Sequence, residues 1–125
     1  MAVWHKRSMT KKTGGKTRRY RKSRKYDLGS EFSEPEVGEQ RITVKDARGN
    51  TTKVRAKRSE TVNLAEDGEV KKAEIEAVVE NPANPNFVRR SLLTEGTIVE
   101  TSEGKAKITS RPGQNGVVNA VPVEE

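Results

Sequence analysis

Positive charge is concentrated at one end of the chain, and this distribution constrains the fold more than any other feature. Residues 1–28 contain eleven Lys and Arg, one acid, and Val3 and Leu28 as their only Val, Ile or Leu. Residues 29–125 contain fourteen Lys and Arg against seventeen Asp and Glu, a net charge of −3. A segment with so little apolar surface cannot offset the entropy lost on ordering. The sequence therefore predicts a basic arm over 1–28 that is disordered when free.

The remaining sequence predicts an acidic linker over residues 29–39 and a folded body over 40–125. Gly, Ser and Pro alternate with four glutamates in the linker, a composition typical of exposed connecting chain. Between residues 40 and 123 there are sixteen Val and Ile but only three Leu. Branching at Cβ favours strands over helices. We expect an all-β fold, a small antiparallel barrel-like body of about six short strands, spaced by turns about every 8–12 residues.

Turn-forming clusters divide the body into hairpins. Strands are expected on both sides of residues 46–50 and of 102–104, and over 117–123 after a turn at 111–116. Residues 69–80 have a composition that suits a helix, but apolar positions alternate with period two, so we predict a strand there. Pro82 and Pro85 predict an irregular loop after it.

Several classes of function are disfavoured by the residues present. The chain has no Cys and one His, so neither a disulfide nor a metal site around His5 is expected, and no cofactor is predicted. The absence of Cys fits a cytoplasmic location. No apolar run exceeds three residues, so no membrane span and no secretory signal is expected.

Two local patterns resemble catalytic motifs without meeting their requirements. Gly15-Lys16-Thr17 looks like the end of a phosphate-binding loop, but Thr10 stands where that loop requires glycine and no apolar strand precedes it. Glu74 and Glu76 share one face of the predicted strand, but the opposite face is the apolar one, so both should be solvated. We therefore expect a protein that is not an enzyme and has no small-molecule substrate.

The arm has the composition of an RNA-binding segment. Dense cations neutralise phosphates and release counterions, Gly14-Gly15 lets backbone approach closely, and aromatic rings stack on the unpaired bases that RNA offers. A solvated tail, a membrane-surface patch and a chromatin-like DNA binder are the alternatives. The candidate RNA-binding residues of the arm are Trp4, His5, Lys6, Arg7, Lys11, Lys12, Gly14, Gly15, Lys16, Arg18, Arg19, Tyr20, Arg21, Lys22, Arg24, Lys25 and Tyr26.

Three arginines of the body are further candidates. Arg89 and Arg90 follow the two prolines, and Arg111 opens the Pro-Gly turn. A phosphate contact and an ordinary surface position are equally open for each of them.

Three motifs of the arm together resemble a known family. They are Trp4-His5-Lys6-Arg7, Lys12-Thr13-Gly14-Gly15-Lys16 and Arg24-Lys25-Tyr26-Asp27-Leu28-Gly29. With Asn81-Pro82-Ala83-Asn84 and the run from Thr109 to Ala120, they resemble the archaeal branch of e-type ribosomal protein eight of the small subunit. The resemblance implies a β-barrel-like body, an extension threaded into small-subunit ribosomal RNA, and neighbouring ribosomal proteins as partners. A basic-tailed RNA- or DNA-binding protein outside the ribosome is the alternative.

Overall fold

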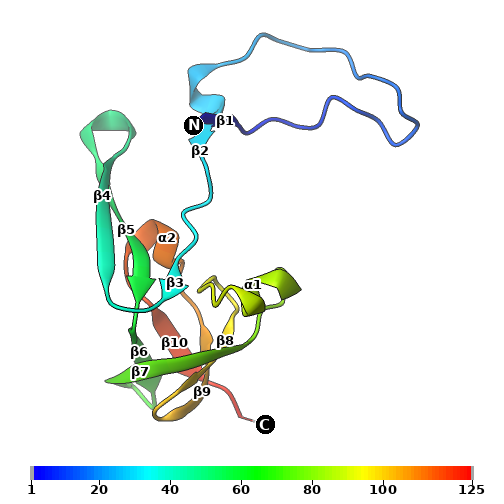
Figure 1. The fold of residues 1–125 in the computed structure, drawn as a ribbon. Helices are drawn as coiled ribbons and strands as arrows, with labels where there is room; N and C mark the ends of the chain where they lie inside the picture. Colours follow the sequence, from blue (N-terminus) through cyan, green and yellow to red (C-terminus); the bar gives the residue numbers. More distant parts are fainter. Residues whose placement is uncertain (1, 125) are drawn as a thin grey trace. The chain divides into compact units, whose positions relative to one another are not determined.

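The chain divides into two compact units. A computed structural model describes residues 2–124 and separates them after Phe32, within the segment predicted as a linker (Figure 1). Both ends of that segment take part in strands, since β2 spans Leu28–Ser30 and β3 spans Glu36–Val37. The first unit contains the arm and the second contains the body.

The body is built around a closed barrel, as predicted. Its strands are β6 (Thr61–Glu66), β7 (Glu69–Glu80), β8 (Ile98–Thr101), β9 (Gly104–Ile108) and β10 (Asn119–Pro122), in the order β10-β6-β7-β8-β9. The barrel was predicted to be antiparallel, and four of its five strand pairs are; the fifth is different, because β10 runs parallel to β6. Strand directions cannot alternate all the way around a ring with an odd number of members, so a five-stranded barrel must contain a parallel pair.

The barrel encloses a core of small and medium-sized side chains. Alternate residues of each strand point inward, and alanines sit beside larger aliphatic residues, which suits the narrow interior of a small barrel. Leu93 and Val99 are fully buried there. The complete core cluster is Val62, Leu64, Ala73, Ile75, Leu93, Val99, Ala106, Ile108, Val118 and Ala120.

The ambiguous segment 69–80 is a strand, as its period predicted. Within β7, Ala73 and Ile75 are buried and Glu74 and Glu76 are exposed. The alternation does not continue to the end, because the pairing of β7 with β8 shifts register after Ile75. A bulge of this kind changes which face a side chain occupies. Val78 is therefore half-buried, although the simple alternation assigned it to the polar face.

The three predicted hairpins are confirmed. Two of them are β8–β9 and β9–β10. The third joins β4 (Arg41–Asp46) to β5 (Thr52–Ser59) through the short 3₁₀ turn η2 (Arg48–Asn50). The β4–β5 hairpin lies outside the barrel, in a three-stranded sheet where β3 pairs in parallel with the end of β5. Beyond β3 it continues as a two-stranded ribbon, called here the β4–β5 ribbon (Figure 1).

Two short helices replace segments predicted as loop and turn. Helix α1 spans Pro85–Arg89, and α2 spans Pro112–Asn115. Pro85 was expected to enforce irregular chain, but proline is compatible with the first helical position. The side chain of Asn84 also caps α1 by accepting a hydrogen bond from the Asn86 amide at 2.9 Å.

Buried hydrogen bonds hold the chain on both sides of α1. The side-chain amide of Asn81 donates to the Thr94 hydroxyl at 2.9 Å, and the backbone amide of Thr94 donates to the Thr97 hydroxyl at 3.1 Å. Asn81 and Thr97 are both buried, so these bonds satisfy polar groups that water cannot reach.

The two ends of the arm meet in one strand pair. β1 (Ala2–Trp4) pairs antiparallel with β2, and the 3₁₀ turn η1 (Lys25–Asp27) directly precedes β2. Residues 5–24 form a long loop between these elements (Figure 1).

Candidate nucleic-acid interface

The base of the arm loop is closed by backbone pairing and by one side chain. Trp4 pairs with Leu28, and the His5 amide donates to the Asp27 carbonyl at 2.8 Å. The imidazole of His5 lies against the Cα of Gly29, in the space that a side chain at position 29 would occupy. His5 was predicted as an RNA contact, and the structure gives its ring a packing role within the arm.

The far part of the loop is a small hairpin. Thr10 and Lys16 form an isolated bridge, and the Thr17 amide donates to the Met9 carbonyl at 2.8 Å. The Gly14 amide closes the turn by donating to the Lys11 carbonyl at 3.0 Å. Gly14 has a φ of +88°, which glycine adopts without steric cost. This turn presents Lys11, Lys12 and Lys16 together at one end of the arm.

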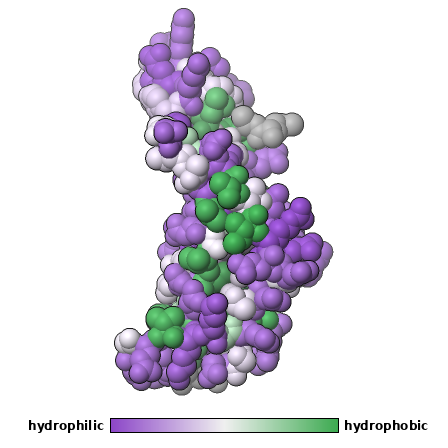
Figure 2. All heavy atoms as spheres, turned by 90° about the vertical axis from the view of Figure 1, so that its left-hand side faces the viewer, coloured by the Kyte–Doolittle hydropathy of each residue, from purple (hydrophilic) through white to green (hydrophobic). Residues whose placement is uncertain are grey.

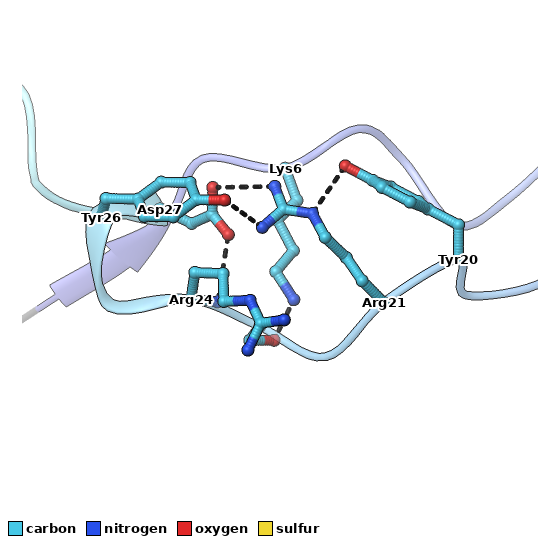
Figure 3. Close-up of polar contacts among 7 residues, drawn as sticks. Lys6, Tyr20, Arg21, Arg24, Tyr26 and Asp27 are labelled. Atoms are coloured by element: carbon cyan, nitrogen blue, oxygen red, sulfur yellow. Dashed lines mark hydrogen bonds and ion pairs between the residues drawn. The ribbon is translucent and has the colours of Figure 1, made fainter.

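Arg21 organises the returning part of the loop (Figure 3). Its Nε donates to the Tyr20 hydroxyl at 2.8 Å, Nη1 donates to the Tyr26 hydroxyl, and Nη2 lies 3.7 Å from Oδ1 of Asp27. Its guanidinium carbon is 5.2 Å from the ring centre of each tyrosine. The hydrogen bond with Tyr20 is the largest cause that raises the pKa of Arg21 above its ordinary value.

Little negative charge is available to neutralise this loop. Asp27 is the only acid among residues 1–28. Its carboxylate faces Arg21 and also accepts a hydrogen bond from the Arg24 amide at 3.2 Å. One carboxylate cannot compensate eleven cations, so the loop keeps a strong positive potential.

The loop encloses a concave surface, and the hollow above it has a volume of about 460 Å³. On its rim the Lys6 ammonium lies 5.3 Å from the centre of the Trp4 ring and donates a hydrogen bond to the Ser23 hydroxyl. Both Trp4, at 50% exposure, and Tyr20, at 78%, present ring surface to solvent. The lining residues are Trp4, His5, Lys6, Arg7, Met9, Arg18, Arg19, Tyr20, Arg21, Lys22, Ser23 and Asp27.

The structure thus places all seventeen predicted arm residues in three groups. Nine of them line the concave surface. Lys11, Lys12, Gly14, Gly15 and Lys16 form the hairpin turn, and Arg24, Lys25 and Tyr26 belong to η1 and the residue before it. The hydrogen bonds of Arg21 with Tyr20 and Tyr26 were not foreseen, because sequence spacing does not reveal them.

The three arginines of the body are not brought together. Arg90 pairs with Glu34 at 2.7 Å after α1, and Arg111 pairs with Glu95 at 2.6 Å before α2. Arg89 is exposed. The carboxylate partner neutralises the charge of an arginine and occupies its hydrogen-bond donors, so a paired arginine attracts a phosphate less strongly than an unpaired one.

A second group of cations lies in the body, outside the predicted RNA-binding residues. Residues 41–58 contain seven Lys and Arg and a single acid, Asp46. All of them lie in the β4–β5 ribbon and its turn. The charge of this window was visible in the sequence, but averaging over residues 29–125 concealed it.

Neither a metal-binding cluster nor a membrane-spanning helix occurs among residues 2–124. Among residues 2–124 there is no group of three His, Asp or Glu placed to hold a metal ion. None of the helices in that range has the length and apolarity needed to cross a membrane.

Comparison with known proteins identifies relatives over nearly the whole chain. Residues 4–123 match the family model of ribosomal protein S8e. Small ribosomal subunit protein eS8 of Haloarcula marismortui is 53% identical over 118 residues, covering 94% of this chain and 96% of the relative. The protein of the same name from Methanospirillum hungatei is 48% identical over 123 residues, covering 97% and 98%. That from Methanocella arvoryzae is 47% identical over 119 residues, covering 94% and 95%. The chain therefore belongs to the ribosomal protein S8e family.

Proposed function

We propose that this protein is a structural component of the small ribosomal subunit and that its arm binds the ribosomal RNA. Relatives of nearly equal length are named as small-subunit ribosomal proteins, which supports the first part. A place in the ribosome also implies the cytoplasm as location and other ribosomal proteins as neighbours. The role is architectural rather than catalytic, since no reaction is needed to hold folded RNA in place.

The observation that carries the second part is the charge and shape of the arm. Its cations outnumber its acids by ten, and nine of the predicted contact residues line one concave surface. Lys and Arg contacts to phosphate provide most of the affinity in complexes of this kind. The exposed rings of Trp4, Tyr20 and Tyr26 supply surfaces on which unpaired bases stack.

We further propose that the arm becomes rigid only on RNA. No described side chain between residues 3 and 32 is buried, so the arm has no core to hold it. Its internal contacts are mostly exposed hydrogen bonds and ring contacts, which contribute little in water. Binding would supply the missing interactions and select one conformation.

Deleting residues 1–28 tests the proposal. The core cluster draws only on residues 62–120, so the truncated body should keep its β-sheet circular dichroism and a cooperative melt. Its affinity for a small-subunit ribosomal RNA transcript should fall severely, and the slope of log affinity against log salt should become much shallower. A folded body with unchanged affinity and slope would place RNA binding elsewhere.

A further inference from the structure

The β4–β5 ribbon carries a charge opposite to that of the rest of the body. Residues 41–58 have a net charge of +6, whereas residues 29–40 and 59–125 together have −9. Positive charge is therefore not a general property of the body. They are gathered on one hairpin that extends away from the barrel (Figure 1).

Strand register sorts the side chains of the ribbon onto two faces. Opposite residues share a face, and faces alternate along each strand. The pairs Thr43–Arg55 and Lys45–Lys53 form one face, called here the cationic face. The pairs Ile42–Ala56 and Val44–Val54 form the other, apolar face. Figure 2 shows apolar side chains gathered over the ribbon, and Val44 is 66% exposed.

Two of the cross-strand pairs bring like charges together. Lys45 lies opposite Lys53, and Arg41 lies opposite Arg58 at the base of the ribbon. Directly opposed like charges destabilise a strand pair. Arg58 is relieved by Glu36, whose carboxylate is 3.6 Å away, but the Lys45–Lys53 pair has no carboxylate on its face. A bound polyanion would remove this repulsion.

Most of these cations remain available. Within residues 2–124, Arg41, Lys45 and Lys57 make no ion pair, in contrast to Arg90 and Arg111. Lys53 donates a hydrogen bond to the neutral Gln114 side chain at 2.8 Å and so keeps its charge uncompensated.

The ribbon is also held in place. Gly116 follows α2 with a φ of +74°, and a Cβ at this position would lie 2.8 Å from Cγ1 and 3.0 Å from the carbonyl oxygen of Val54. This close approach fixes β5 against the chain after α2. A positioned ribbon loses less freedom on binding than a mobile hairpin would.

We propose that the cationic face is a second RNA-binding surface, which contacts the phosphate backbone independently of the arm. This inference rests on the proposed function, because RNA is the ligand of the arm. An acidic protein is the competing partner. The composition favours RNA, since Lys is depleted at protein–protein interfaces and is a usual phosphate contact. Same-face residues on a strand are about 6.6 Å apart, which is comparable with the spacing of successive phosphates.

The test compares two full-length triple variants of equal net charge. The ribbon variant carries Lys45→Gln and Lys53→Gln on the cationic face. It also carries Lys57→Gln, two residues after Arg55 in β5, at the register shift near the base of the ribbon. Its matched control carries Lys71→Gln, Lys72→Gln and Lys107→Gln, three exposed lysines on barrel strands. Binding to an archaeal small-subunit ribosomal RNA transcript is measured at several salt concentrations. Each lost phosphate contact reduces the slope by about 0.7–0.9, so the ribbon variant should lose roughly two units of slope and about tenfold or more in affinity.

Equal losses in the two variants, or no loss in the ribbon variant, would overturn the inference. Normal RNA binding combined with poor incorporation into subunits would also overturn it and would indicate an acidic protein partner. A third full-length variant, with Arg18→Gln, Arg19→Gln and Lys22→Gln, separates this inference from the proposed function. If only that variant binds weakly, the ribbon inference fails and the arm proposal stands. If only the ribbon variant binds weakly, the proposal for the arm fails and the ribbon inference stands.

Discussion

The imidazole of His5 lies directly on the Cα of Gly29, across the strand pair that closes the arm loop. Any side chain at position 29 must displace the ring. We predict that Gly29→Ala destabilises the ordered arm by about 1–3 kcal/mol through overpacking. In the RNA-bound protein, the His5 amide, which bonds to Asp27, should then exchange faster. RNA affinity should fall with it.

Two variants check that explanation. Gly15→Ala is the matched control for amide exchange, because a Cβ there lies 3.7 Å from Thr13 Oγ1 and should leave protection of the His5 amide unchanged. In the double variant His5→Ala/Gly29→Ala the clash is absent, so amide protection should return. Continued rapid exchange in the double variant would mean that the ring contact is not the cause.

The exposed aromatic rings should contribute to RNA affinity in a way that salt does not alter. Replacing Trp4, Tyr20 or Tyr26 by Ala should weaken binding by roughly 1–3 kcal/mol for each ring that stacks on a base. The salt slope should change little, since no cation is removed. Binding isotherms at several salt concentrations measure both quantities.

Tyr20→Phe distinguishes stacking from the contact with Arg21. It keeps the ring and removes the hydroxyl that accepts the hydrogen bond from Arg21 Nε. We expect near-normal affinity. An effect as large as that of Tyr20→Ala would assign the contribution to the hydrogen bond instead.

Gly116→Ala should destabilise the body by more than the cost of placing a non-glycine residue in a left-handed backbone conformation. The left-handed backbone costs a non-glycine residue about 1–2 kcal/mol, and the approach to Val54 adds a steric clash. Gly68→Ala provides the comparison, because Gly68 has a φ of +81° with nothing within 4 Å. Denaturant unfolding should show a larger loss for Gly116→Ala, and equal losses would argue against the clash.

Leu93→Ala should cost about 2–5 kcal/mol in unfolding free energy, because it leaves a cavity in a small closed core. Leu93 is fully buried, whereas Val70 on β7 is 67% exposed. Val70→Ala should therefore change stability by only about 0.5 kcal/mol or less. Similar losses in the two variants would show that the barrel interior does not dominate stability.

Most of the local strand structure was predictable from this sequence, whereas the barrel strand β6 and the strand order were not. Alternation through Ala73 and Ile75 identified β7 despite its helix-like composition, because period two is a direct consequence of strand geometry. The parallel pairing of β10 with β6 depends on barrel closure, which no local pattern reports. Helix α1 was missed because Pro85 was taken to break structure, when it begins the helix.

The candidate residues of the arm could be named from the sequence, whereas their contacts could not. Dense cations and the Trp4, Tyr20 and Tyr26 rings predict a nucleic-acid-binding segment without any structure. The packing of His5 on Gly29 depends on the register of β1 with β2 and needed coordinates. The ribbon was overlooked for a different reason, since Lys45 and Lys53 become neighbours only once β4 and β5 pair.

Closure of the barrel by β10 also sets an order of events during synthesis. The arm is translated first and β10 is the last strand of the described chain, so the ring β10-β6-β7-β8-β9 cannot close until nearly all of these residues have been made. Throughout that interval the nascent chain displays its polycationic segment while the body is still an open sheet with two unpaired edges. Exposed edges of this kind invite pairing with other chains. Early capture of the arm by RNA would hold each nascent chain apart from its copies until β10 completes the ring.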